Sequence, residues 1–301
     1  MAEPAEFRSY YGKPILKEPA WKQPDVPLYL FLGGVAGASA SMATVARPAG
    51  RANLARVATV AAGATSMASV AALIHDLGRP ERFLNMLRVF KPTSPLSVGS
   101  WILAPFSGLA SAAALSTITG RLPRLGALAG VSAGLLGPAM CTYTAVLLAD
   151  TATPAWHEGH RQLPVLFAGS ALTGGAGVAL LAVTPAEAVP ARRLGLVGAA
   201  AELVASSRLE HGLGVVSEPY RTGRAGTLLK ASKALTVAGA ALSVFGRRNR
   251  IASAIAGSAY LAAGLCTRFG VYSAGVESTK DPKYVVVPQR ERMARKANAS
   301  T

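Results

Sequence analysis

Eight long apolar runs constrain the fold of this chain more than any other feature. A helix needs roughly twenty apolar residues to cross a hydrocarbon core about 30 Å thick. Such runs occupy residues 27–46, 54–74, 97–119, 125–149, 163–183, 192–213, 228–246 and 250–272. They predict an all-α integral membrane protein with eight transmembrane helices. The runs at 192–213 and 228–246 carry the weakest signal, because Glu202 interrupts the first and the second is short.

The composition agrees with a membrane protein. The chain is 51% hydrophobic and 15% charged, whereas a soluble domain carries about 25% charged residues. A net charge of +16 would suggest nucleic acid in a soluble protein. Here the basic residues gather in connectors and tails, which indicates membrane-side anchors and topology signals and no nucleic-acid partner. Cys141 and Cys266 lie inside apolar runs and form no CxxC motif or disulfide framework. The proline-rich segment 1–26 lacks the basic start and apolar core of a signal peptide.

Small residues recur at helical spacing in two of the runs. They are Gly33, Gly37 and Ser41 in the first run and Gly126, Gly130 and Gly134 in the fourth. Such patterns predict close helix–helix packing. Pro138 lies inside the fourth run and is expected to kink that helix and free a carbonyl near Gly134.

The connectors differ strongly between the two faces of the predicted bundle. Those on one face are short and basic, and those on the other are long and mixed in sign, as are both tails. The density of Lys and Arg favours short loops in the cytoplasm and tails outside, because the rule holds best for short loops. A raw count of basic residues favours the opposite orientation. We call the face with the long connectors and the tails the crowded face, and a partner could dock there.

The connector after the second run, HDLGRPERFLNMLRVF at 75–90, is amphipathic. Its basic and apolar residues fall on opposite sides of a helix: Arg79, Arg82 and Arg88 on one, and Phe83, Leu84, Leu87 and Phe90 on the other. This pattern predicts a helix in the membrane interface that begins at Pro80 and ends before Pro92 and Pro95. Such a segment could shape an entrance from the lipid or carry a docked subunit.

The histidines do not suggest haem or a metal. A transmembrane haem needs axial histidines within facing helices, but His75, His157, His160 and His211 all lie near helix ends or in connectors of the crowded face. In WHEGH, only Glu158 accompanies His157 and His160, and a solvated loop explains that motif better than a metal site.

Three acidic residues are candidates for proton transfer or ligand binding. Glu202 lies well inside an apolar run, where an acid is costly and suggests a polar pathway or partner. The alternative is a polar helix seam, with Ser206 one turn away. Asp76 and Asp150 lie at helix ends, where a carboxylate could also be a cap or an interfacial charge.

Two tyrosines suggest a quinone site. A quinone head needs one or two hydrogen-bond donors in an apolar cleft. Tyr143 follows Pro138, and Tyr29 lies near the start of the first run, so both fall near the crowded face beside His75 and Asp76. Taken singly, either tyrosine could be an aromatic-belt anchor.

Several motifs resemble the NrfD family, the membrane subunits of polysulfide reductase and related molybdenum enzyme complexes. They are IHDLGRPERFLNML, SPLSVGSWIL, YTAVLLAD, LPVLFAGSALTGGAG and TRFGVYSAGVESTKDP, in this order between about residues 27 and 290. The resemblance implies two four-helix bundles without haem, a quinone site in the first bundle, a ferredoxin-like iron–sulfur partner and a catalytic molybdopterin subunit. By motif position Tyr143 would lie beside the quinone, and Tyr29 would take the place of a polar residue at the start of the first helix.

The resemblance divides the chain into a polar tail, two bundles and a basic tail, at residues 1–26, 27–150, 151–273 and 274–301. It implies a haem-free anchor in the plasma membrane that exchanges electrons between the iron–sulfur subunit and menaquinone. Tyr143, His75, Asp76 and Tyr29 are its expected quinone-site residues, Glu202 and Asp150 its proton route, and Arg79, Arg82 and Arg88 its docking residues.

Two other classes of protein remain open from the residues alone. A secondary transporter would suit eight helices and a buried Glu202, but transporters tend to have paired broken helices, and Pro138 has no clear mate in the second half. A purely structural anchor would not need donors that converge at one depth.

Overall fold

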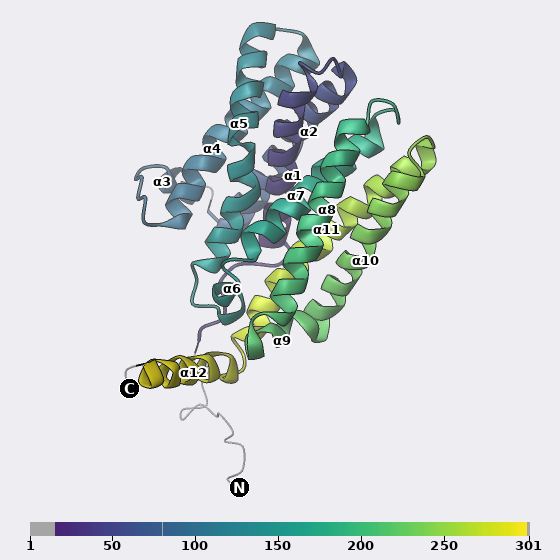
Figure 1. The fold of residues 1–301 in the computed structure, drawn as a ribbon. Helices are drawn as coiled ribbons and strands as arrows, with labels where there is room; N and C mark the ends of the chain where they lie inside the picture. The colour runs from purple at the N-terminus through teal and green to yellow at the C-terminus, as the bar shows by residue number, and fades with distance from the viewer. Residues whose placement is uncertain (1–15, 80, 300–301) are drawn as a thin grey trace.

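The chain is helical throughout the part that the computed structural model describes, residues 16–79 and 81–299 (Figure 1). Its eight longest helices are α1 (Asp25–Ala46), α2 (Ala52–Leu77), α4 (Pro95–Thr119), α5 (Pro123–Ala149), α7 (Leu163–Ala182), α8 (Val189–His211), α10 (Gly223–Phe245) and α11 (Arg250–Ser278). The connecting and terminal elements are α3 (Glu81–Met86), α6 (Pro154–Glu158), η1 (Gly214–Ser217), α9 (Glu218–Arg221) and α12 (Lys283–Ala299). The expected all-α class is confirmed for these residues.

Seven of the long helices in the described residues are long and apolar enough to cross a membrane. The exception is α8, which carries Arg192, Arg193, Glu202, Arg208 and Glu210. Its length matches that of its neighbours, and its polar residues lower its hydropathy. A multi-pass membrane protein is therefore supported, and α8 is the helix that composition alone does not identify as a span.

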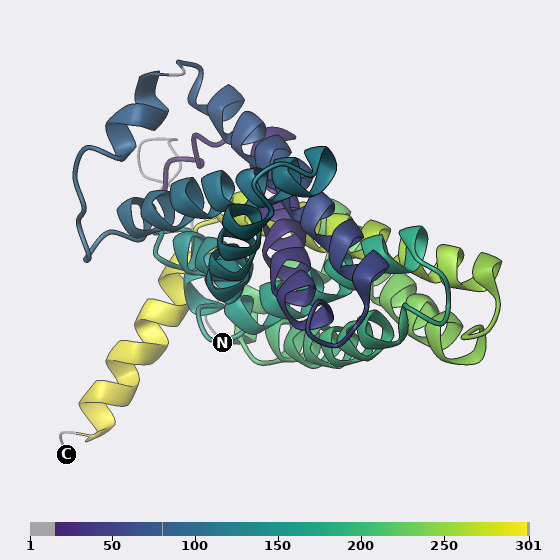
Figure 2. The same cartoon turned by 90° about the horizontal axis from the view of Figure 1, so that it is seen from above.

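The long helices pack in two groups that follow the chain order. In the first group α1 contacts α2 and α5, and α4 contacts the same two helices. In the second group α7 contacts α8 and α11, and α10 contacts those two. The groups meet where α7 packs against α1 and α5, and α11 against α1. Helices α6, α9 and α12 lie at one end of the molecule, which is the crowded face (Figure 1). Figure 2 shows the two helix groups side by side, seen from above.

Glycine packing between α1 and α5 confirms the predicted close seam. A Cβ atom on Gly37 would lie 2.6 Å from the carbonyl oxygen of Gly137, so neither helix tolerates a side chain at this contact. Pro138 has no N–H to offer the carbonyl of Gly134 four residues earlier. That carbonyl instead accepts a hydrogen bond of 2.9 Å from the hydroxyl of Ser41 on α1. The proline thus contributes to the seam, and α5 continues through it.

The predicted interfacial helix is wrong in its extent. Helix α3 covers only residues 81–86, and Pro80, its expected start, lies outside the described residues. Further along, the Ser97 hydroxyl donates to the carbonyl of Val89 and accepts from the amide of Lys91. These bonds hold residues 89–91 outside any helix, and a helix as short as α3 has little stability of its own. Phe83 packs on the core, whereas Phe90 is exposed.

Candidate functional site

Tyr29 and Tyr143 form a buried pair in the first helix group, which we call the tyrosine pair. Tyr29 lies about one turn after the start of α1, and Tyr143 lies less than two turns before the end of α5. Both side chains are buried, and their hydroxyls are in hydrogen-bond contact. Two of the four expected quinone-site residues are therefore in contact, at the depth of one to two helical turns below the crowded face.

The other two helices of the group complete the surroundings of the tyrosine pair. On α4, Gly99 faces the ring of Tyr143 so closely that a Cβ atom would lie 2.8 Å from the ring carbon Cε2. On α2, the Ser69 hydroxyl donates a 3.0 Å hydrogen bond to the carbonyl of Tyr29. The pair belongs to an apolar core that also contains Leu103, Phe106, Met140 and Leu148. Hydrogen-bond donors are therefore held in dry, apolar surroundings by all four helices.

His75 and Asp76 lie at the end of α2 and contact the start of α1 and the segment that precedes it. The Nδ1 atom of His75 lies 2.7 Å from the Oδ2 atom of Asp25, and the histidine side chain is 78% exposed. The Oδ1 atom of Asp76 accepts a 2.8 Å hydrogen bond from the backbone amide of Lys22. Both side chains thus contact Lys22 or Asp25, and neither side chain bonds to the tyrosine hydroxyls.

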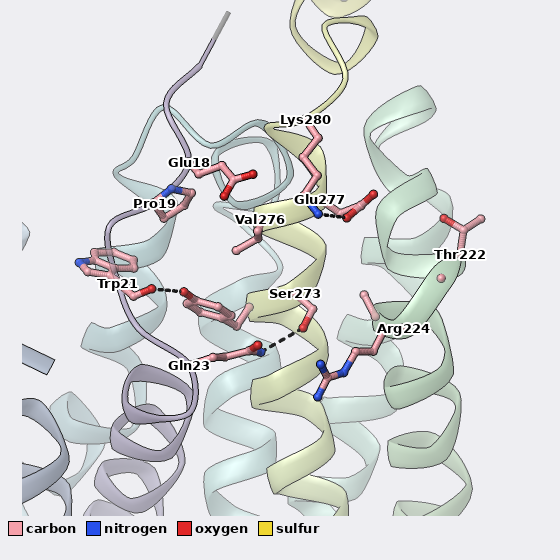
Figure 3. A pocket seen from close by; sticks show the side chains of 13 residues that line it. Glu18, Pro19, Trp21, Gln23, Thr222, Arg224, Ser273, Val276, Glu277 and Lys280 are labelled. Atoms are coloured by element: carbon pink, nitrogen blue, oxygen red, sulfur yellow. Dashed lines mark hydrogen bonds and ion pairs between the residues drawn. The ribbon is translucent and has the colours of Figure 1, made fainter. Parts of the chain in front are cut away.

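Residues 18–23 form a strap over the junction of the two helix groups. Trp21 stacks on Trp156 of α6 at 5.7 Å between ring centroids, and its carbonyl accepts from the hydroxyl of Tyr272. The side-chain amide of Gln23 donates through Nε2 to the Ser273 hydroxyl at 3.3 Å (Figure 3). Together with Asp76, these contacts fasten the strap to α2, α6 and α11, so that it covers the ends of both groups.

A cleft of about 770 Å³ opens beside the strap, between the end of α11 and the start of α10 (Figure 3). Its lining mixes aromatic, polar and charged side chains, among them Glu18, Trp21, Gln23, Arg224, Tyr272, Glu277 and Lys280. Lys280 pairs with Glu277 at 2.9 Å, and this hydrogen bond raises the pKa of the lysine. The cleft opens at the crowded face and has a polar rim, unlike the dry surroundings of the tyrosine pair.

Glu202 lies in a buried cluster of hydroxyls in the second helix group. Its side chain is 2% exposed. Thr267 of α11 donates to it at 2.6 Å and Thr173 of α7 at 3.3 Å, while Ser232 of α10 lies at 3.5 Å. The expected polar environment is present, but Ser206, the expected partner, donates to Glu210 instead. The carboxylate therefore draws its partners from three other helices, a set that we call the Glu202 cluster.

The other acidic groups lie closer to the crowded face. Glu210, two turns further along α8, forms a 2.6 Å ion pair with Lys233 of α10. Asp150 is exposed just after the end of α5, in the first helix group. The two expected proton-route residues, Glu202 and Asp150, thus belong to different helix groups.

Arg268 of α11 is a buried charge that the sequence analysis missed. Its side chain is 1% exposed. Its Nε atom donates to the carbonyl of Leu30 at 3.3 Å and its Nη2 atom to that of Phe167 at 3.0 Å, and the guanidinium lies 3.7 Å from the centre of the Phe167 ring. The available signal was an arginine inside an apolar run, which in a membrane helix indicates a functional position.

The residues expected to dock a partner are exposed at the crowded face. Arg79, Arg82 and Arg88 all lie at the surface, and Arg82 also donates to the carbonyl of Leu77 at the end of α2. Between residues 16 and 299, apart from position 80, no group of three or more His, Cys, Asp or Glu side chains is arranged to hold a metal ion. His157 and His160 instead direct their Nδ1 atoms at backbone carbonyls.

The chain matches a known protein family. A family model described as "Polysulphide reductase, NrfD" matches residues 18–190, which is more than half of the chain. The matched part contains the strap, the whole first helix group, α6 and α7. No curated protein matches the chain.

Proposed function

The chain belongs to the NrfD family, and from that premise we propose that it is the haem-free membrane subunit that exchanges electrons between an iron–sulfur partner and a quinone. Membership indicates a membrane subunit of an oxidoreductase complex. The observation that carries the proposal further is the tyrosine pair, two buried hydroxyls that meet in an apolar core below the crowded face.

The side chains around the pair fit a quinone. A quinone head presents two carbonyl acceptors on an apolar ring, and recognition needs a small number of donors in apolar surroundings. One hydroxyl of the tyrosine pair donates to the other, and the O–H of the accepting tyrosine is left for a quinone carbonyl. The absence of a side chain at Gly99 leaves the ring of Tyr143 against the backbone of α4. When bound, a quinone accepts two electrons and two protons per molecule reduced. The chain supplies orientation, exclusion of water and hydrogen-bond donors.

His75 and Asp76 support this site from its surface end. Their bonds to Asp25 and to the amide of Lys22 hold the start of α1, which carries Tyr29. We therefore assign His75 and Asp76 to the mouth of the quinone site, between the site and the aqueous face. Only the tyrosine pair is assigned direct hydrogen bonds to the quinone. Menaquinone is the proposed species.

The crowded face is the proposed side of the iron–sulfur subunit, which in turn would contact a molybdopterin subunit. The strap, α3 and α12 lie at this face (Figure 1), and the tyrosine pair lies one to two turns below it. Exposed Arg79, Arg82 and Arg88 offer a basic contact for an acidic partner surface. This arrangement keeps the electron donor and the quinone head on the same side of the membrane.

We further propose that all eight long helices cross the plasma membrane as two four-helix bundles, with the crowded face outside. Helix α8 is included because its polar side chains Glu202 and Glu210 face partners on α10 and α11, so that they are not presented to lipid. Glu202 and Asp150 are the proposed proton-route residues, one inside the second bundle and one at the surface of the first.

Quinone binding by the purified subunit tests the proposal. Trp101 lies on α4 two residues after Gly99 and is partly exposed, so its fluorescence should respond to a naphthoquinone that enters beside the tyrosine pair. Saturable quenching that a non-fluorescent quinone analogue reverses is expected. The absence of saturable binding to either the subunit or its complex would favour a purely structural anchor or a transporter.

A further inference from the structure

Arg268 carries a charge that the proposed function does not yet use. Its guanidinium is buried inside the helix bundle, and its Nη1 atom has no hydrogen-bond partner although it is buried. An ionisable group at such a position in a membrane protein is costly and marks function by default. Simple helix packing would be served better by an apolar side chain, so the contacts of Arg268 need an explanation.

On one side Arg268 reaches the helix of the tyrosine pair. Its Nε atom donates to the carbonyl of Leu30, the residue directly after Tyr29. The approach is close because α1 has a glycine there: a Cβ atom on Gly34 would lie 3.2 Å from the Nη2 atom of Arg268. Arg268 therefore ties α11 of the second helix group to the part of α1 that holds Tyr29 against Tyr143.

On the other side the same stretch of α11 reaches the Glu202 cluster. Thr267, the residue directly before Arg268, donates to Glu202 at 2.6 Å and also bonds to Ser232 at 2.6 Å. Adjacent residues of one continuous helix thus contact the acid of the second group and the tyrosine helix of the first. A buried charge acts over several ångströms, because the low dielectric of a protein interior screens it weakly.

We propose that Arg268 is a positioning residue that couples the protonation of Glu202 to quinone affinity at the tyrosine pair. The proposal rests on the quinone function proposed above. While Glu202 is ionised, its charge offsets that of Arg268. Once Glu202 is neutral, the arginine leaves an uncompensated positive charge beside α1, which strengthens donation by the tyrosine hydroxyls to a quinone carbonyl. Quinone binding is therefore tighter when Glu202 is protonated.

Few other titratable groups lie near Arg268 and could change the charge around it. Besides Glu202, the titratable groups near Arg268 on the helices packed around it are Tyr29, Cys141, Tyr143, Glu210, Lys233, Tyr260, Cys266 and Tyr272, and α7 carries none. Glu210 and Lys233 neutralise each other in an ion pair. Glu202 is therefore the acid whose protonation changes the net charge next to Arg268.

A double-mutant cycle tests the coupling. The dissociation constant of a naphthoquinone is measured for the native complex, Glu202→Gln, Arg268→Gln and the variant with both changes. Glu202→Gln should tighten binding by about twofold or more in the native background and leave it unchanged when Arg268 is Gln. Independent sites would contribute additively, so a difference between the two backgrounds measures the coupling. An equal effect in both backgrounds, or no effect in the native one, overturns the proposal.

Two further measurements separate coupling from folding defects. Arg268→Lys keeps the charge, so it should retain the response to Glu202→Gln. Arg192→Gln is the matched control, because Arg192 is also buried and keeps unpartnered nitrogens, but it lies in the first turn of α8, where it bonds to Pro185. That variant should respond to Glu202→Gln as the native protein does.

If Arg268→Gln fails to assemble, the pH dependence of quinone affinity decides. Native binding should weaken as pH rises, and the affinity of Glu202→Gln should not follow that trend. A native affinity that is independent of pH, or an unchanged pH dependence in Glu202→Gln, contradicts the coupling. If the native complex does not bind quinone, the quinone function itself is refuted. If it binds quinone but the effects of Glu202→Gln and Arg268→Gln on the dissociation constant are additive, only the coupling is refuted.

Discussion

Replacing Tyr143 with Phe removes one hydroxyl from the tyrosine pair and keeps the ring. The ring's contact with Gly99 should survive, so packing changes little. Loss of one neutral hydrogen bond typically costs about 0.5–1.5 kcal/mol, which weakens quinone affinity by roughly tenfold or less. If the hydroxyl also transfers a proton during turnover, the rate should fall by about 100-fold or more. A raised Michaelis constant alone therefore indicates positioning, and a collapsed rate indicates proton transfer.

The assay is quinol turnover by the purified complex, with partner activity on a soluble dye measured in parallel. The dye reaction bypasses this subunit and should be intact. Tyr220→Phe is the matched control, because Tyr220 is also buried and donates a single 2.8 Å hydrogen bond, to the carbonyl of Ala155 in the second half of the chain. That variant should lose comparable stability, about 1 kcal/mol, and keep quinol turnover. Unchanged turnover in Tyr143→Phe would show that this hydroxyl contributes to helix packing alone and that the quinone site lies elsewhere.

Three other predictions concern the contact of Gly99 with Tyr143, the docking surface and the absence of haem. Gly99→Ala places a Cβ atom 2.8 Å from the ring of Tyr143, so quinol turnover should fall while dye activity is kept; normal quinone kinetics would argue against a site at this contact. Reversing the charge of Arg82 and Arg88 to Glu should release the partner from detergent-solubilised complexes, whereas Arg121→Glu at the opposite face should not, and equal co-purification of all variants contradicts the docking surface. The purified subunit should show no haem Soret band, and a stoichiometric b-type spectrum would overturn the haem-free assignment.

Much of the helical architecture could be predicted because apolar length is a local property. The long runs locate the long helices to within a few residues, and the small-residue pattern correctly predicts the glycine seam at Gly37. The similar depth of Tyr29 and Tyr143 could also be predicted from the sequence, because helix ends set the depth of a residue in the membrane. Their hydroxyl contact depends on the rotation of α1 against α5, which a periodic pattern of glycines only partly specifies.

The remaining features depend on contacts between distant segments. The hydroxyl partners of Glu202 come from three other helices, and nothing near position 202 identifies them. The contacts of Arg268 with Leu30 of α1 and Phe167 of α7 depend on helix packing, which single-helix patterns do not encode. The extent of α3 was overestimated because amphipathic spacing ignores the hydrogen bonds through which Ser97 holds the following turn. Asp76 likewise binds Lys22 of the strap, a segment without helical periodicity, and His75 pairs with Asp25, the first residue of α1.

Photoaffinity labelling can locate a bound quinone and shows whether it lies at the tyrosine pair. The native complex in liposomes is illuminated with an azido-quinone, and the labelled peptides are identified by mass spectrometry, with and without an excess of unmodified quinone. The account predicts label that the excess removes, in α1, α4 or α5 near Tyr29, Gly99 and Tyr143. Competable label confined to α7, α8, α10 and α11, or label that excess quinone does not remove, would contradict it.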